Sequence, residues 1–146
     1  MGNIYGVANP LNIPAVYVPA ADVALPAGTE TTIITTGAIA QIGPGNYFPL
    51  VLLTVAILNG ATIPTALTAA FKIGAGSDVD SFVVADAALV AASTESFTVA
   101  LIGANSGTAW VGAGSTINIT LLAAGNAATL KAVGTRAIVM LLRGPD

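Results

Sequence analysis

The side chains best suited to chemistry in this sequence are a few carboxylates that lie close together. Asp78 and Asp80 are two residues apart, Asp86 follows six residues later, and Glu95 comes after a further nine. Short acidic loops can bind calcium, but the ligand spacing of an EF-hand is absent. A glycosidase pair would need a cleft lined with aromatic and polar groups, and only 5% of residues are aromatic. We therefore predict no metal site and no catalytic residues here, only a solvated loop that keeps a sheet edge soluble.

Two residue types that dominate site chemistry are missing from the chain. There is no cysteine, which excludes disulfides and thiolate metal sites. There is no histidine, which removes the commonest general base and the commonest transition-metal ligand. The glycine-rich segments 43–45 and 112–115 lack the Lys-Ser or Lys-Thr of a phosphate-binding loop, so we interpret them as turns. We expect a protein without a cofactor and without enzymatic activity.

Charge is scarce along the chain. Asp, Glu, Lys and Arg make up 8% of the 146 residues, whereas about 25% is typical of soluble domains. The net charge is −3 and the four basic residues are dispersed, which argues against a nucleic-acid partner. Because so few charges would leave a monomer poorly hydrated, we expect much of the surface to be buried between subunits. The alternative is a monomer whose surface is rich in Thr, Ser and Asn.

Residues 31–71 carry no formal charge, so a membrane segment has to be considered. A spanning helix needs about 20 mostly apolar residues in succession. The best apolar run, residues 48–58, is about half that length. It is interrupted by a proline at position 49 and ends in an Asn-Gly turn signal. We predict no membrane association, and the N-terminus lacks the basic and apolar regions of a signal peptide.

Hydrophobic periodicity and turn residues divide the chain into strands. Residues 115–123 alternate between apolar and polar types, which is the period of a half-buried strand. Turn signals recur about every 10–14 residues without a long helical pattern between them. We predict an all-β protein, an antiparallel β-sandwich or jelly roll of about 8–10 strands. The predicted strands are 29–41, 47–58, 66–73, 79–90, 94–102, 115–123, 128–132 and 135–142, and one alternative stays open: the Ala-rich residues 85–92 could form one or two helical turns.

Residues 1–28 differ from the remainder of the chain. They hold four of the eight prolines, each of which disfavours helix and biases its predecessor to an extended conformation. The residues between the prolines are apolar, whereas a disordered tail would be polar. We predict an extended arm over residues 1–28 and a sandwich domain over residues 29–146. The arm either clamps a neighbouring subunit or a lattice, or packs as a first strand on its own domain.

The last predicted strand, 135–142, is apolar on both faces. A soluble strand of this kind needs cover on both faces, one from its own domain and one from something else. Aromatic residues in the arm are candidate anchors, because aromatics are enriched in interfaces. The predicted subunit or lattice interface consists of Tyr5, Leu11, Ile13, Val16, Tyr17, Val18, Val139 and Leu141.

The closing segment is similar to that of a known class of proteins. An alternating strand, a Gly-Asn turn, a short strand and an apolar last strand ending in Leu141-Leu142-Arg143-Gly144 resemble the last strands of compact trimeric jelly rolls. Gly45-Asn46-Tyr47-Phe48 before a long apolar strand is similar to the start of such modules. The resemblance covers roughly residues 29–144. It extends to bacteriophage capsid decoration (cement) proteins, phage fibre tips and, more distantly, C1q/TNF-like modules.

The resemblance implies a homotrimer around a three-fold axis and a role on the capsid surface of a virion. The implied partner is the lattice of the major capsid protein, with the arm reaching neighbouring copies. C1q/TNF-like modules usually place aromatics at the trimer axis, where this chain would have Ala, Val, Ile and Leu, so phage-type assembly is favoured. Two alternatives stay open: a single jelly-roll capsid shell protein, and a fibre-tip or carbohydrate-binding module around Trp110, Asp78 and Asp80.

Overall fold

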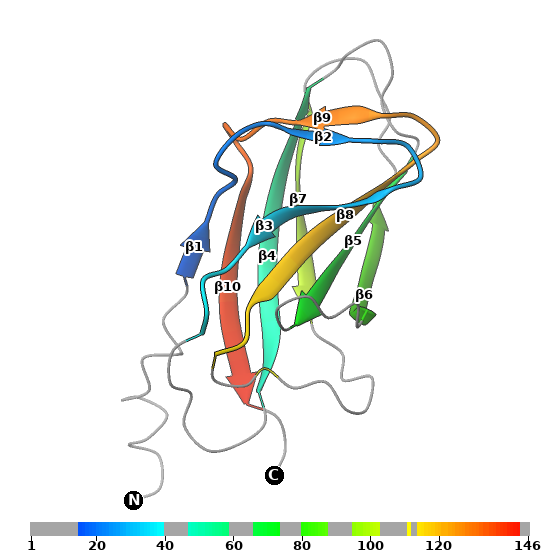
Figure 1. The fold of residues 1–146 in the computed structure, drawn as a ribbon. Helices are drawn as coiled ribbons and strands as arrows, with labels where there is room; N and C mark the ends of the chain where they lie inside the picture. Colours follow the sequence, from blue (N-terminus) through cyan, green and yellow to red (C-terminus); the bar gives the residue numbers. More distant parts are fainter. Residues whose placement is uncertain are drawn as a thin grey trace, which may run out of the picture.

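Ten β-strands make up the part of the chain that the structure, a computed structural model, describes (Figure 1). This part comprises residues 15–39, 47–58, 66–73, 80–87, 95–102, 111 and 114–143. It contains no helix that is long and apolar enough to cross a membrane. The strands are β1 (Ala15–Tyr17), β2 (Val23–Leu25), β3 (Glu30–Thr35), β4 (Tyr47–Leu58), β5 (Ala66–Ile73), β6 (Asp80–Ala87), β7 (Glu95–Ile102), β8 (Ile117–Ala124), β9 (Ala128–Leu130) and β10 (Arg136–Arg143).

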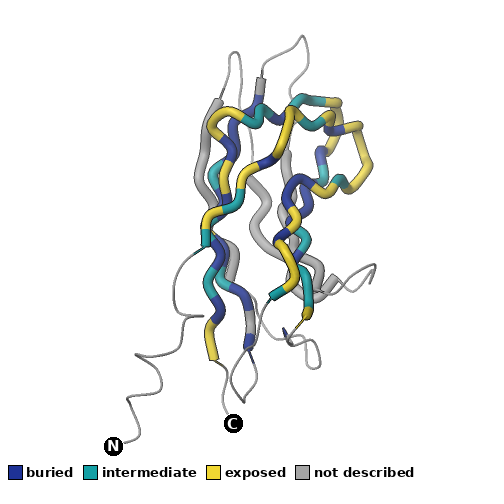
Figure 2. The backbone as a smooth tube through the Cα atoms, turned by 60° about the vertical axis from the view of Figure 1, so that its left-hand side comes forward, coloured by how far each residue is buried: buried dark blue, intermediate teal, exposed yellow. Residues whose placement is uncertain are grey.

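The strands form two antiparallel sheets that lie in two layers (Figures 1 and 2). The first sheet has the order β1-β10-β4-β9-β2, and β7 pairs with the second edge of β4. The second sheet has the order β3-β8-β5-β6. The prediction of an all-β antiparallel sandwich with about 8–10 strands is confirmed.

The order of the strands is that of a jelly roll. When the three-residue strands β2 and β9 are set aside, eight strands remain. When these eight are numbered again along the chain, strands 1, 8, 3 and 6 form one sheet, which is β1-β10-β4-β7. The second, seventh, fourth and fifth form the other, β3-β8-β5-β6. A jelly roll is a two-sheet sandwich of eight such strands, and β2 and β9 extend its first sheet as a short antiparallel pair.

The core lies between the sheets and is built from alternate residues of the long strands. Successive side chains of a strand point to opposite faces, and buried and exposed positions alternate accordingly (Figure 2). The odd-numbered side chains of β4 from Val51 to Ile57 are at most 1% exposed. Those of β8 from Ile117 to Ala123 are equally buried, and β10 adds Ala137, Val139 and Leu141.

A β-bulge in β3 supplies two consecutive core residues. The pairing of β3 with β8 shifts register between Thr32 and Ile34. An extra residue at a bulge breaks the strict alternation of faces. Ile33 and Ile34 are therefore both buried, at 5% and 3% exposed. β3 ends at Thr35, whereas the predicted strand continued to residue 41; residues 36–39 belong to no strand.

The turn between β9 and β10 completes the hydrogen bonding of β4. Strands β10 and β9 pair with successive parts of β4 and leave Ala56 between them. The amide of Lys131 donates to the Ala56 carbonyl at 2.8 Å, and the Ala56 amide donates to Oγ1 of Thr135 at 3.1 Å. Gly134 in the same turn has a φ of +94°, and a Cβ there would lie 3.0 Å from the Cβ of Ala56. Only glycine fits this position without strain.

Half of the predicted N-terminal arm belongs to the sandwich. β1 pairs with β10 and β2 pairs with β9. Leu25 of β2 is 1% exposed and lies in the core. Residues 15–25 are therefore integrated in the first sheet, whereas Ala27 and Gly28 pair with Ala123 of β8 in the second sheet. This leaves residues 1–14, which lie outside the described residues, for the predicted arm.

Alanine substitutions at two neighbouring leucines of β8 test which face of the strand lies in the core. Leu121 is 1% exposed in the core, whereas Leu122 is half-buried on the outer side of the sheet. Leu121→Ala should lower the free energy of unfolding by about 2–5 kcal/mol, because it removes buried surface and leaves a cavity. Leu122→Ala should lower it by about 1 kcal/mol. Urea unfolding measures both losses, and equal losses would contradict the assigned burial.

Candidate subunit interface

The side chains of the carboxylates identified in the sequence lie outside what the structure describes. Asp80 and Asp86 lie near opposite ends of β6, and Glu95 begins β7. Asp78 and Trp110 lie entirely outside the described residues. Within the described part of the chain, no three His, Cys, Asp or Glu residues are grouped so that they could hold a metal ion. The surfaces of the two sheets are the next places to examine.

The outer side of the first sheet is apolar across β1, β10 and β4. Odd-numbered residues of β10 and β4 face the core, so the even-numbered residues face outward. Val16 is 61% exposed, Leu52 is 38% exposed and Leu142 is 36% exposed. The remaining members are half-buried. We call this surface the outer apolar face; it consists of Val16, Leu50, Leu52, Ile138, Met140 and Leu142.

The register of the sheet places these residues side by side. Val16 lies opposite Ile138, and Ile138 lies opposite Leu52, which makes one apolar row across three strands. In the next row Met140 lies opposite Leu50. Directly paired residues on one face have Cβ atoms about 4.5–5.5 Å apart, so the rows form a continuous surface. A contiguous exposed apolar surface of this kind marks an interaction site.

On the outer side of the second sheet, β3 and β8 carry several polar groups. Oγ1 of Thr35 donates to Oδ1 of Asn118 at 2.9 Å, and Oγ1 of Thr120 donates to Oε1 of Glu30 at 2.6 Å. These bonds join β3 to β8 on the side away from the core. Hydroxyl, amide and carboxylate groups are readily hydrated, whereas the outer apolar face is not. The described outer side of β3 and β8 is therefore better suited to water than the outer apolar face.

The structure places the predicted interface residues in different environments. Val16 and Val18 are 61% and 63% exposed, whereas Tyr17 packs against the core. Val139 and Leu141 are only 7% and 6% exposed and lie in the core, because the pairing of β10 with β4 turns them inward. The prediction is corrected at these two positions: their outward neighbours on β10 are the surface residues. The remaining three, Tyr5, Leu11 and Ile13, lie outside the described residues.

Sequence reasoning missed the outward residues of β4 and β10, although one signal could have identified them. The last strand was recognised as apolar on both faces, but nothing in its own sequence decides which face is inside. Thr54 is the only polar residue between positions 48 and 58, and it belongs on the outer side of its strand. Leu52 lies two residues from Thr54 and must then also point outward. Ile138 lies directly opposite Leu52 in the antiparallel pairing, so it faces the same side.

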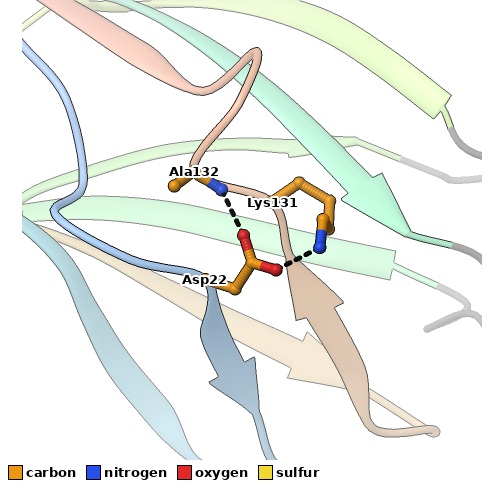
Figure 3. A network of polar contacts seen from close by, with 3 residues as sticks. All are labelled: Asp22, Lys131 and Ala132. Atoms are coloured by element: carbon orange, nitrogen blue, oxygen red, sulfur yellow. Dashed lines mark hydrogen bonds and ion pairs between the residues drawn. The ribbon is translucent and has the colours of Figure 1, made fainter.

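The carboxylate of Asp22 ties the end of β9 to the start of β2 (Figure 3). Nζ of Lys131 donates to Oδ2 of Asp22, and the amide of Ala132 donates to Oδ1 at 2.9 Å. The hydrogen bond from Lys131, followed by that from Ala132, holds the pKa of the Asp22 carboxyl below its usual 3.8. Because both carboxylate oxygens bind groups of the chain itself, this contact is structural rather than catalytic.

Acid should remove the contribution of this contact to stability. A carboxyl whose pKa is lowered by folding stabilises the fold above its unfolded pKa, and that contribution is lost as pH falls through the folded pKa. Wild type should therefore be more stable than Asp22→Asn at pH 6, and the difference should shrink as the pH falls below 3.8 and vanish once it is below the lowered pKa of the folded protein. Chemical denaturation at several pH values measures this difference, and Lys131→Gln should show the same trend. A difference that is constant across pH would contradict the assignment.

The sequence matches no protein-family model and no curated protein sequence. The fold is similar to that of a chain in the structure of infectious bursal disease virus, Gx strain, with a TM-score of 0.43 and 13% sequence identity. The match covers 92% of this chain, which spans 33% of the length of that chain. A likeness of this extent supports no conclusion about function, so the function has to follow from the two sheet surfaces.

Proposed function

We propose that this protein is a non-enzymatic structural protein of a virion, a capsid decoration or cement protein that forms homotrimers. The observation that carries the proposal is the outer apolar face, which occupies one outer side of the sandwich. In the trimer each copy buries this face against a neighbour. The trimer then binds the lattice of the major capsid protein at the capsid surface and stabilises the shell.

Three features support this proposal. The strand order is that of a jelly roll, and the closing strands resemble those of trimeric decoration proteins. Only 8% of the residues are charged, which suits a chain whose surface is partly covered by other copies. The polar outer side of β3 and β8 provides the surface that remains in water after assembly.

The alternative function is that of a single jelly-roll capsid shell protein, which would use the same surface for contacts between copies. In that case contacts between copies would build the lattice itself, without a separate coat protein. The two functions differ in what the isolated chain does. A shell protein assembles into closed particles that electron microscopy detects, whereas a decoration protein remains a small oligomer of fixed size.

A charge placed in the outer apolar face should separate the subunits. Sedimentation velocity of the wild-type protein at micromolar concentration should give three times the 14.3 kDa mass of one chain. Leu52→Lys should give monomers, because an unpaired charge opposes burial of the face. Thr32→Lys is the matched control, since Thr32 is exposed on the second sheet, and it should leave the mass unchanged. A wild-type protein that is monomeric at this concentration would contradict the proposal.

A further inference from the structure

The outer apolar face is small for the interface that a stable assembly needs. Strands lie about 4.8 Å apart and rise about 3.3 Å per residue. The three strands that carry the face, β1, β10 and β4, therefore present at most roughly 380 Å² at the eight-residue length of β10. A standard interface buries about 800 Å² on each partner. The face therefore needs a second apolar element to complete the contact between copies.

Residues 1–14 join the sandwich at this surface. They lead into Ala15, the first residue of β1, which lies at the edge of the first sheet beside the exposed Val16. The first charged side chain of the sequence is Asp22, so the segment is uncharged apart from the terminal amine. Its apolar side chains suit an apolar surface and are poorly suited to water. They are Ile4, Tyr5, Val7, Leu11 and Ile13.

The direction of β1 is along the edge of its sheet and not across the outer side of that sheet. β1 runs antiparallel to β10, with Ala15 opposite Val139, so at Ala15 the axis of the strand points back toward Arg143, the end of β10. Pro14 has a fixed φ and biases Ile13 to an extended conformation, so a reversal across the sheet at this point is disfavoured. An extended chain of 14 residues reaches at most about 46–50 Å. That reach exceeds the roughly 26 Å length of β10, so the segment can extend to a neighbouring copy.

We propose that residues 1–14 of one copy lie across the outer apolar face of a neighbouring copy. The inference rests on the proposed trimer and identifies the segment that completes its interface. Exchange of this segment around the three-fold axis gives every copy one donated arm and one covered face. The apolar side chains of the arm and of the face leave water together, which supplies the contact area that the face lacks alone.

Cysteine cross-linking tests the exchange directly, because the chain contains no cysteine of its own. Arm variants Tyr5→Cys and Leu11→Cys are each refolded together with Leu52→Cys and treated with a short bis-maleimide. We expect cross-linked pairs that contain one arm variant and one face variant. Thr32→Cys in place of Leu52→Cys is the control on the polar sheet and should give no such pair. The double variant Tyr5→Cys/Leu52→Cys tests the opposite arrangement: if the mixed pairs fail to form and the double variant cross-links within single chains, the proposal is overturned, because the arm then covers its own face.

Deletion of residues 1–14 tests the exchange of arms independently of the proposed trimer. The shortened chain keeps all ten described strands, so its far-UV circular dichroism should match that of the full chain. Its trimer should dissociate at a concentration at least tenfold higher than that of the full chain. A full chain that is monomeric contradicts the proposed function itself. A full-length trimer whose stability is unchanged by the deletion contradicts only the exchange of arms.

Discussion

A strand in a two-layer sandwich has a single face in the core, and β4 and β10 carry apolar side chains on both. Their antiparallel pairing runs from Arg136 opposite Thr54 to Arg143 opposite Tyr47. This register commits the odd-numbered residues of both strands to the core, where Val51, Leu53 and their neighbours are almost fully buried. A slip by one residue would exchange the two faces of a strand. The outer apolar face is therefore a direct consequence of how these two strands pair.

The two outer sides of the sandwich differ in the way that an assembling protein requires. Thr35 and Asn118, between β3 and β8, bond to each other and remain exposed or partly exposed to water, whereas Thr120 is buried and donates to Glu30 of the same sheet. The opposite side is apolar in the middle of β1, β10 and β4, and the outward residues Arg136 and Thr54 lie opposite each other at one end of that surface. A sandwich of two layers has no second interior for these apolar side chains, so this surface is the candidate for contact with another chain.

Much of the fold could be predicted from the sequence, because period-2 patterns and turn residues are local signals. The bounds of β4 and β5 agree with the predicted strands, β7 differs by one residue at its start, and β10 differs by one residue at each end. The pairing of β1 and β2 with distant strands could not be predicted, since partners more than 100 residues away leave no local pattern. Val139 and Leu141 were predicted on the surface of β10 but lie in the core, because a strand apolar on both faces does not reveal which face is inside.

Met140 provides a natural probe of whether the outer apolar face is covered. It is half-buried on this face in a single chain, and Met1 is the other methionine of the sequence. Peroxide oxidises accessible methionine to the sulfoxide, which mass spectrometry locates in the chain. In the assembled protein, Met140 should oxidise roughly tenfold more slowly than in the dissociated Leu52→Lys variant, because a partner excludes the oxidant. Equal rates in the two proteins would show that the face remains in water, and the central claim would be wrong.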